Sequence, residues 1–159
     1  RLEDAPADYH PSRIMPDFQS VIVLARETSK HEHAAKVHHA VATIAAQDAV
    51  IRYLRGKGYK TEVIGSRAKA VSLPRLGERA GVGELSPFHS LAVRGHGLRT
   101  VLTAIITDAP LESSPMATDA CPDRSQCLKR CAALNPDGQF DRSRCKSCGA
   151  CVATCPVES

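Results

Sequence analysis

The apolar residues in the first part of the chain occur in two kinds of run. Residues 20–25, SVIVLA, form an unbroken apolar run of strand length, which predicts a strand buried on both faces. From about residue 32 to residue 55 the apolar residues recur at helical spacing, which predicts a long amphipathic helix. Its apolar stripe is expected to comprise Val37, Val41, Ile44, Ile51 and Leu54. Gly56 or Gly58 is expected to end this helix with a left-handed backbone.

The rest of the first 118 residues predicts three more elements and one boundary. Residues 61–64 read as a strand, residues 73–83 as a short helix that begins at Pro74, and residues 99–108 as a strand rich in β-branched side chains. Prolines and serines in residues 109–118 indicate a linker. We therefore predict an α+β chain, with an α/β body at residues 1–112 and a cysteine-bearing domain at residues 113–159.

Composition narrows the class of protein. Of the 159 residues, 43% are hydrophobic but only 4% are aromatic, so the core must be largely aliphatic. No apolar stretch is long enough for a membrane helix. The net charge of +4 is scattered, which gives little reason to expect a nucleic-acid partner. The chain begins at Arg1 rather than Met, which suggests a trimmed chain and leaves a removed leader open.

All seven cysteines lie between Cys121 and Cys155. A disulfide scaffold would spread an even number of cysteines through the fold, so this crowding favours a metal site in a reducing, cytoplasmic environment. Residues 145–156, CKSCGACVATCP, follow the spacing C-x-x-C-x-x-C-x-x-x-C-P of bacterial ferredoxins. In such pairs of motifs the fourth cysteine binds the other cluster. The spacing thus predicts a complete [4Fe–4S] cluster on Cys131, Cys145, Cys148 and Cys151.

The earlier stretch, residues 121–131, has the same spacing but carries Arg124 at the second ligand position. A protonated guanidinium has no lone pair for a metal. The remaining thiolates of this second site are Cys121, Cys127 and Cys155. Three readings stay open for it: a [3Fe–4S] cluster, a [4Fe–4S] cluster with a non-cysteine ligand, or an empty site. Zinc is the alternative for the complete motif, because zinc also binds closely spaced thiolates.

The clustered histidines and the basic residues near the cysteines are more simply interpreted as surface residues. His31, His33, His38 and His39 crowd together, but no two are three or four residues apart, so they do not form a helical metal pair. The basic residues near the cysteines are expected to form a solvated face, with tuning of the clusters or guidance of an acidic electron donor as the alternative. They are Lys129, Arg130, Arg142, Arg144 and Lys146.

Several short motifs outside the cysteines resemble one superfamily. Residues 80–84 read AGVGE, residues 107–111 read TDAPL, and Gly97 and Arg99 lie between them. Residues 15–25 and 56–64 also match the order of segments in this superfamily. With the two cysteine motifs, this arrangement resembles the cobalamin-dependent reductases, which comprise reductive dehalogenases and epoxyqueuosine reductases. The resemblance implies a nitroreductase-like body that holds a corrinoid, with two clusters that supply it with electrons.

Two departures separate the chain from that family. Epoxyqueuosine reductases carry an aspartate where this chain has Val71, and both branches usually place a basic residue where it has Pro87. A proton donor and an anion-stabilising cation are therefore missing at the matching positions. The catalytic residues remain unknown, and Arg94, His96 and Arg99 are the expected contacts if a corrinoid binds. His89 and Tyr59 are further replacement candidates.

These residues lead to two main functional hypotheses. The first is an electron-transfer protein or reductase subunit, which relays single electrons through one complete cluster and a three-cysteine site to a redox partner or larger complex. The second is a corrinoid-dependent reductase with altered catalytic residues. A role on tRNA, by analogy with one branch of the superfamily, is a third hypothesis with only mild basicity behind it. The residues alone do not decide whether the chain is an enzyme.

Overall fold

The computed structural model describes residues 10–28, 38–64, 71–121, 125, 129, 131–146, 148–153, 155 and 157, and within these ranges the side chains of residues 38–42 are not described. A three-stranded antiparallel sheet forms the centre of the body, with strand order β1-β5-β2. These strands are β1 (Ser20–Glu27), β5 (Thr100–Thr107) and β2 (Thr61–Ile64). The chain is thus an α+β protein, as its sequence predicts.

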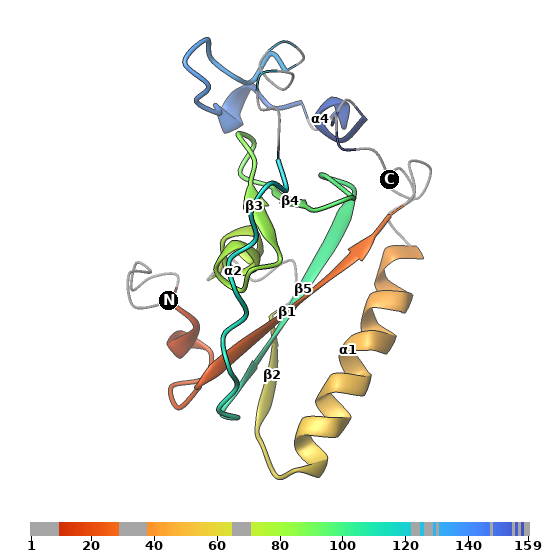
Figure 1. Ribbon diagram of the computed structural model, residues 1–159, viewed down its shortest axis with the longest axis vertical. Coiled ribbons are helices and arrows are strands. Elements are labelled where there is room, and N and C mark those ends of the chain that lie inside the picture. Colours follow the sequence, from red (N-terminus) through yellow and green to blue (C-terminus); the bar gives the residue numbers. More distant parts are fainter. Residues whose placement is uncertain are drawn as a thin grey trace.

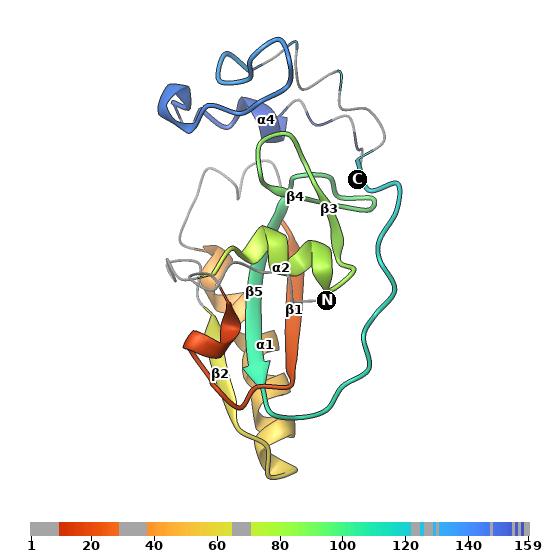
Figure 2. The same cartoon turned by 90° about the vertical axis from the view of Figure 1, so that its left-hand side faces the viewer.

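One helix lies on each face of this sheet (Figures 1 and 2). Helix α1 (His38–Gly56) packs on β5 and β2, and helix α2 (Leu73–Arg79) packs on β5 and β1. The α2 side carries the main aliphatic core, in which Ile64, Ala104 and Ile106 are buried. No helix within the described ranges combines the length and apolarity needed to cross a bilayer.

Strand β1 is confirmed, but the prediction that both its faces are buried is wrong. Residues 20–24 are only half-buried. Strand β1 lies at an edge of the sheet, and its only strand partner is β5, with Val23 opposite Ala104. Because α1 packs chiefly on β5 and β2, the α1 side of β1 keeps part of its exposure.

The orientation of α1 also differs from the predicted apolar stripe. Ile44 is 52% exposed, whereas Thr43 and Gln47 are buried and face the sheet with Leu54. The Thr103 hydroxyl donates a 3.1 Å hydrogen bond to Gln47 Oε1, so a buried polar pair occupies part of the helix–sheet contact. Val37 lies outside the described residues, and the side chain of Val41 is not described.

The helix ends where the glycines predict. Gly58 has a φ of 89°, and the next amide, that of Tyr59, donates back to Leu54 O at 3.1 Å. Left-handed backbone of this kind is the usual conformation at a helix end that glycine permits. The reversal brings the chain directly into β2.

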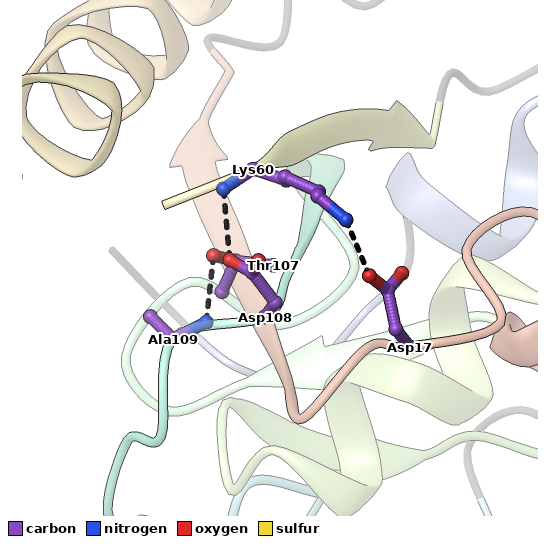
Figure 3. Close-up of polar contacts among 5 residues, drawn as sticks. All are labelled: Asp17, Lys60, Thr107, Asp108 and Ala109. Atoms are coloured by element: carbon purple, nitrogen blue, oxygen red, sulfur yellow. Dashed lines mark hydrogen bonds and ion pairs between the residues drawn. The ribbon is translucent and has the colours of Figure 1, made fainter. Parts of the chain in front are cut away.

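Polar contacts close the end of the sheet that carries the TDAPL stretch (Figure 3). The backbone N–H of Lys60 donates to Asp108 Oδ1 at 2.8 Å, and its Nζ pairs with Asp17 Oδ2 at 2.6 Å. This pairing lowers the pKa of Asp17 and raises that of Lys60, although both groups are fully exposed. The Ala109 amide donates to Thr107 Oγ1 at 3.1 Å. The polar residues of this motif therefore have structural roles in the fold.

No sequence pattern predicts the β-hairpin at the other end of the body. Strands β3 (Gly83–Leu85) and β4 (Leu91–Val93) are three residues each, too short to show a clear alternation. Helix α2 ends just before β3, so the segment predicted as one short helix to residue 83 is a helix followed by a strand. This hairpin faces the cysteine-bearing tail (Figure 1).

The linker predicted at residues 109–118 has no regular structure. It runs along the body from the far end of β5 to the tail (Figure 2). Within its described residues, the tail includes a 3₁₀ turn, η3 (Arg142–Arg144), the short helix α4 (Ala150–Ala153) and an isolated bridge between Leu134 and Phe140. The domain boundary at residue 112 stays a prediction.

Candidate metal centre

The cysteine-bearing tail packs against the β3–β4 hairpin through a small apolar cluster. Buried Phe88, Ala92, Leu98 and Leu134 form its centre. Four half-buried cysteines pack on it: Cys121, Cys131, Cys151 and Cys155. The rings of Phe88 and Phe140 meet edge to face with centroids 6.1 Å apart, which joins the body to the tail. The thiols are thus held in apolar surroundings. An apolar shell of this kind limits the access of water to a bound cluster.

Tight turns present the cysteines of the later motif. The Asp141 carboxylate accepts hydrogen bonds from the backbone and hydroxyl of Ser143 at 2.9 and 2.6 Å, and these bonds lower the pKa of Asp141. This cap begins η3, and Cys145 follows directly after it. Cys151 lies in α4, whose amides at Val152 and Ala153 donate to Gly149 O at 3.0 Å. Local hydrogen bonds therefore fix the backbone on both sides of the motif.

The surroundings of the Cys151 thiol change its pKa. Burial raises the pKa of the Cys151 thiol, and the neighbouring thiolates of Cys131 and Cys145 raise it further. Cys131 belongs to the earlier motif, whereas Cys145 and Cys151 belong to the later one. Cys131 and Cys151 pack on the same apolar cluster, so the fold brings these two predicted ligands of the complete cluster together across the two motifs. The other two, Cys145 and Cys148, are exposed.

The six cysteines that the structure describes are all free thiols. No group of three or more His, Cys, Asp or Glu side chains within the described ranges is gathered closely enough to hold one metal ion. Ligands of a four-iron cluster bind different iron atoms, so they need not converge on one point. The packing of Cys131 and Cys151 on an apolar centre, with Cys145 exposed, fits such a cluster.

Two cysteines predicted for the second site contact the body directly. The Cys121 amide donates to Glu84 Oε2 at 2.9 Å. Cys155 lies against Gly97, where an added methyl group would overlap Sγ and approach Val157 Cβ at 3.0 Å. Cys127 and Arg124 lie outside the described residues. The described cysteines that are predicted for the second site therefore lie at the junction of tail and body.

Arg99, one of the three expected corrinoid contacts, forms a hydrogen bond with the tail. Its guanidinium is buried, with the residue 5% exposed, and donates to Val157 O at 2.7 Å. It therefore anchors the segment that carries Cys155. Arg94 is exposed, and His96 Nδ1 lies 3.4 Å from Glu27 Oε2. Both belong to the turn that joins β4 to β5.

The further replacement candidates do not share one place. His89 lies in the β3–β4 turn with a φ of 57°, and its ring is 5.9 Å from that of Phe140. Tyr59 precedes β2, whose first residue, Thr61, pairs with Thr107 at the far end of β5. At about 3.4 Å per residue, the eight residues of β5 separate Tyr59 from His96 by more than about 20 Å. Tyr59 is therefore excluded from a common site with His96.

The side chains of the four clustered histidines are not described by the structure. His31 and His33 lie outside the described residues, and His38 and His39 begin α1 with side chains that are not described. The basic residues Lys129, Arg142, Arg144 and Lys146 are exposed, as a solvated face requires, and Arg130 is not described. Arg144 also donates to Asn135 Oδ1 at 2.9 Å.

Comparison with protein families identifies the tail. Residues 139–159 match the 4Fe-4S binding domain family. The tail is a [4Fe–4S] region. The match spans three of the four predicted ligands of the complete cluster, and it favours iron–sulfur over zinc for this motif. No curated protein sequence is significantly similar to the chain.

Solved structures share the fold over almost the whole chain. A selenomethionine-labelled epoxyqueuosine reductase superposes with a TM-score of 0.76 at 20% identity and covers 98% of this chain. The Streptococcus thermophilus enzyme gives 0.73 at 16% over 93%, and an epoxyqueuosine reductase with a modified tRNA stem loop gives 0.74 at 20% over 98%. This chain covers 54%, 51% and 53% of those structures, so it spans about half their length.

Sequence reasoning located the cysteines but missed their partners in the body. Glu84 and Gly97 belong to the short motifs that carry the resemblance to the reductase superfamily. Each also touches a predicted cluster ligand or its backbone. The signal that could have found them is their place in the glycine-rich stretches before β5. Glycine there permits the tail to approach the backbone closely.

Proposed function

We propose that the chain is an iron–sulfur electron-transfer protein, or the electron-transfer part of a reductase, that relays single electrons through one complete [4Fe–4S] cluster and a second cluster site. The observation that carries this proposal is the packing of Cys131 and Cys151 on one apolar cluster, in a tail whose residues 139–159 match the 4Fe-4S binding domain family. Thiolate ligands of this kind need a reducing compartment, which supports a cytoplasmic location.

The placement of the two sites suggests a direction through the molecule. Cys145 and Cys148 are exposed, so the complete cluster would lie near the surface of the tail. Cys121 and Cys155 touch the body at Glu84 and Gly97, so the second cluster would lie between the first cluster and the β4–β5 turn. Electrons would enter at the exposed cluster and leave toward the body, or follow the reverse path.

A redox protein is the expected partner. Arg142, Arg144 and Lys146 are exposed and flank Cys145 in the sequence. A cationic rim around a cluster raises the encounter rate with an acidic partner, and salt weakens this effect. Nothing in the described surface gives nucleic acid the same support.

The relay can be tested with anaerobically purified protein. Reduction with dithionite should bleach the cluster absorbance, and a one-electron acceptor such as cytochrome c should restore it. Titration should reveal two one-electron steps between about −700 and +450 mV. Absorbance that does not recover, or iron that is released on the first reduction, would contradict an electron relay.

A corrinoid-dependent reductase is the second candidate. The Thr28 hydroxyl is fully buried and has no hydrogen-bond partner within the described residues, which suits a site for a bound polar ligand. Thr28 follows directly after β1, and its amide donates at 2.9 Å to the carbonyl of Arg99, the last residue of the β4–β5 turn that also carries Arg94 and His96. A bound corrinoid would supply a cobalt centre that accepts electrons from the clusters. Anaerobic incubation with cobalamin should then give a bound spectrum, and protein that keeps its iron but ignores cobalamin would exclude this candidate.

A further inference from the structure

The second cluster site lacks one thiolate, and the fold places a carboxylate beside it. We propose that Glu84 supplies the non-cysteine ligand of a second [4Fe–4S] cluster, together with Cys121, Cys127 and Cys155. This inference rests on the proposed electron-transfer function, because it concerns the same cluster site. It assigns to a residue of the body the ligand role that Arg124 cannot perform.

The first support is the direction of the Glu84 side chain. Glu84 lies in the middle of β3 and pairs with Ala92 of β4. Residues that face each other across an antiparallel ladder project to the same side of the sheet. Ala92 is 1% exposed and belongs to the apolar cluster on which the cysteines pack. Glu84 therefore projects toward the tail.

The second support is a direct contact with a predicted ligand. Glu84 Oε2 accepts the Cys121 amide hydrogen at 2.9 Å, which fixes the carboxylate next to this cysteine. A carboxylate has two oxygens and about four lone pairs, so this bond leaves capacity for a metal. The distance between the carboxylate and the first cysteine of the site is therefore already short.

The third support is that another ligand of the same site reaches the same small sheet. Cys155 lies against Gly97, and Gly97 forms a bridge with Val93. Val93 pairs with Gly83, the residue just before Glu84. Cys121 and Cys155 thus approach neighbouring positions of the β3–β4 hairpin, one through Glu84 and the other through Gly97.

The chemistry of such a ligand predicts a distinctive cluster. Thiolates are the preferred ligands of iron–sulfur clusters, whereas a carboxylate is a harder ligand. The iron on Glu84 should therefore be the most easily lost. Under a one-electron oxidant, [4Fe–4S]²⁺ would release one Fe²⁺ and give up one electron to leave [3Fe–4S]⁺, with charge and iron balanced.

The decisive variant is Glu84→Gln. Glutamine keeps an oxygen that accepts the Cys121 amide hydrogen, but it lacks the negative charge that binds iron. We expect anaerobic wild-type protein to hold two four-iron clusters and Glu84→Gln to hold one iron fewer, roughly one in eight. Loss of one Fe²⁺ from [4Fe–4S]²⁺ leaves [3Fe–4S]⁰, so the variant should show the EPR signal of [3Fe–4S]⁺ once ferricyanide has removed one electron.

A matched control lies in α2, which packs against the same hairpin. Glu78 Oε1 accepts the Leu85 amide hydrogen at 3.1 Å, the same kind of bond at the next residue of β3. Glu78→Gln should keep the wild-type iron content and spectrum. The double variant Glu84→Gln/Arg124→Cys should regain the lost iron, because a thiolate then occupies the ligand position.

The outcomes separate this inference from the proposed function. Full iron content in Glu84→Gln would overturn the assignment of Glu84. A second site that is empty or three-iron in the wild type would also overturn it, although the complete cluster would remain. Wild-type protein without any iron–sulfur cluster would overturn the proposed function itself.

Discussion

Replacement of Cys131 by alanine should remove the complete [4Fe–4S] cluster, although three of its four ligands belong to the other cysteine motif. Cys131 and Cys145 both raise the pKa of Cys151, so the fold already brings the two motifs together at this point. A four-iron cluster that loses one of four thiolates leaves one iron without its ligand. We expect a loss of up to about four irons per chain and of the corresponding EPR signal in reduced protein.

Cys127→Ala is the matched control for this prediction. It removes a cysteine from the same earlier motif, four residues before Cys131. The crossed ligand sets predict that Cys127→Ala damages the second cluster and spares the complete one. If Cys127→Ala abolished the signal of the complete cluster while Cys131→Ala spared it, the ligand sets would be wrong.

Gly97→Ala should displace Cys155 and empty the second cluster site. The added methyl group would overlap Cys155 Sγ and approach Val157 Cβ at 3.0 Å. Gly97 also has a φ of 56°, a conformation that costs other residues about 1–2 kcal/mol. Overpacking of a close contact typically adds about 1–3 kcal/mol. The iron of the second site and the melting temperature should therefore both fall.

Gly95→Ala separates the close contact from the backbone strain. Gly95 lies in the same turn with a φ of 77°, but an added methyl group would meet no atom within 4 Å. This variant should lower stability by about 1–2 kcal/mol and keep both clusters. Equal iron loss in the two variants would show that strain in the turn, rather than contact with Cys155, is responsible.

The body shows how far local patterns can predict this fold. Residues 61–64 and 99–108 were predicted as strands, and both are strands in the sheet, because their β-branched runs have no competing period. The face of α1 could not be predicted, because a hydrogen bond between Thr103 and Gln47 decides which side is buried. That partner is more than fifty residues away in the chain.

The metal centre shows a similar division. Spacing alone places Cys131 with Cys145 and Cys151, because the pitch of a ferredoxin motif is a local property. The roles of Arg99 and Glu84 depend on how the tail docks on the body, and the local spacing of cysteines contains no information on docking. Arg99, whose contact with a corrinoid stays a prediction, donates to the carbonyl of Val157.

The chain shares its fold with epoxyqueuosine reductases, and residues 139–159 match the 4Fe-4S binding domain family. The chain spans about half the length of those structures and has Val71 and Pro87 at the two positions where it departs from the motifs it resembles. Through Glu84, Gly97 and Arg99, the body contacts the segments that carry Cys121 and Cys155.

Iron and acid-labile sulfide, measured together with zinc on anaerobically purified protein and followed by Mössbauer spectroscopy, test the central claim most directly. The account predicts iron and sulfide in nearly equal amounts, spectra of four-iron clusters and no bound zinc. Stoichiometric zinc without sulfide, or cystine bridges among Cys131, Cys145, Cys148 and Cys151, would contradict it.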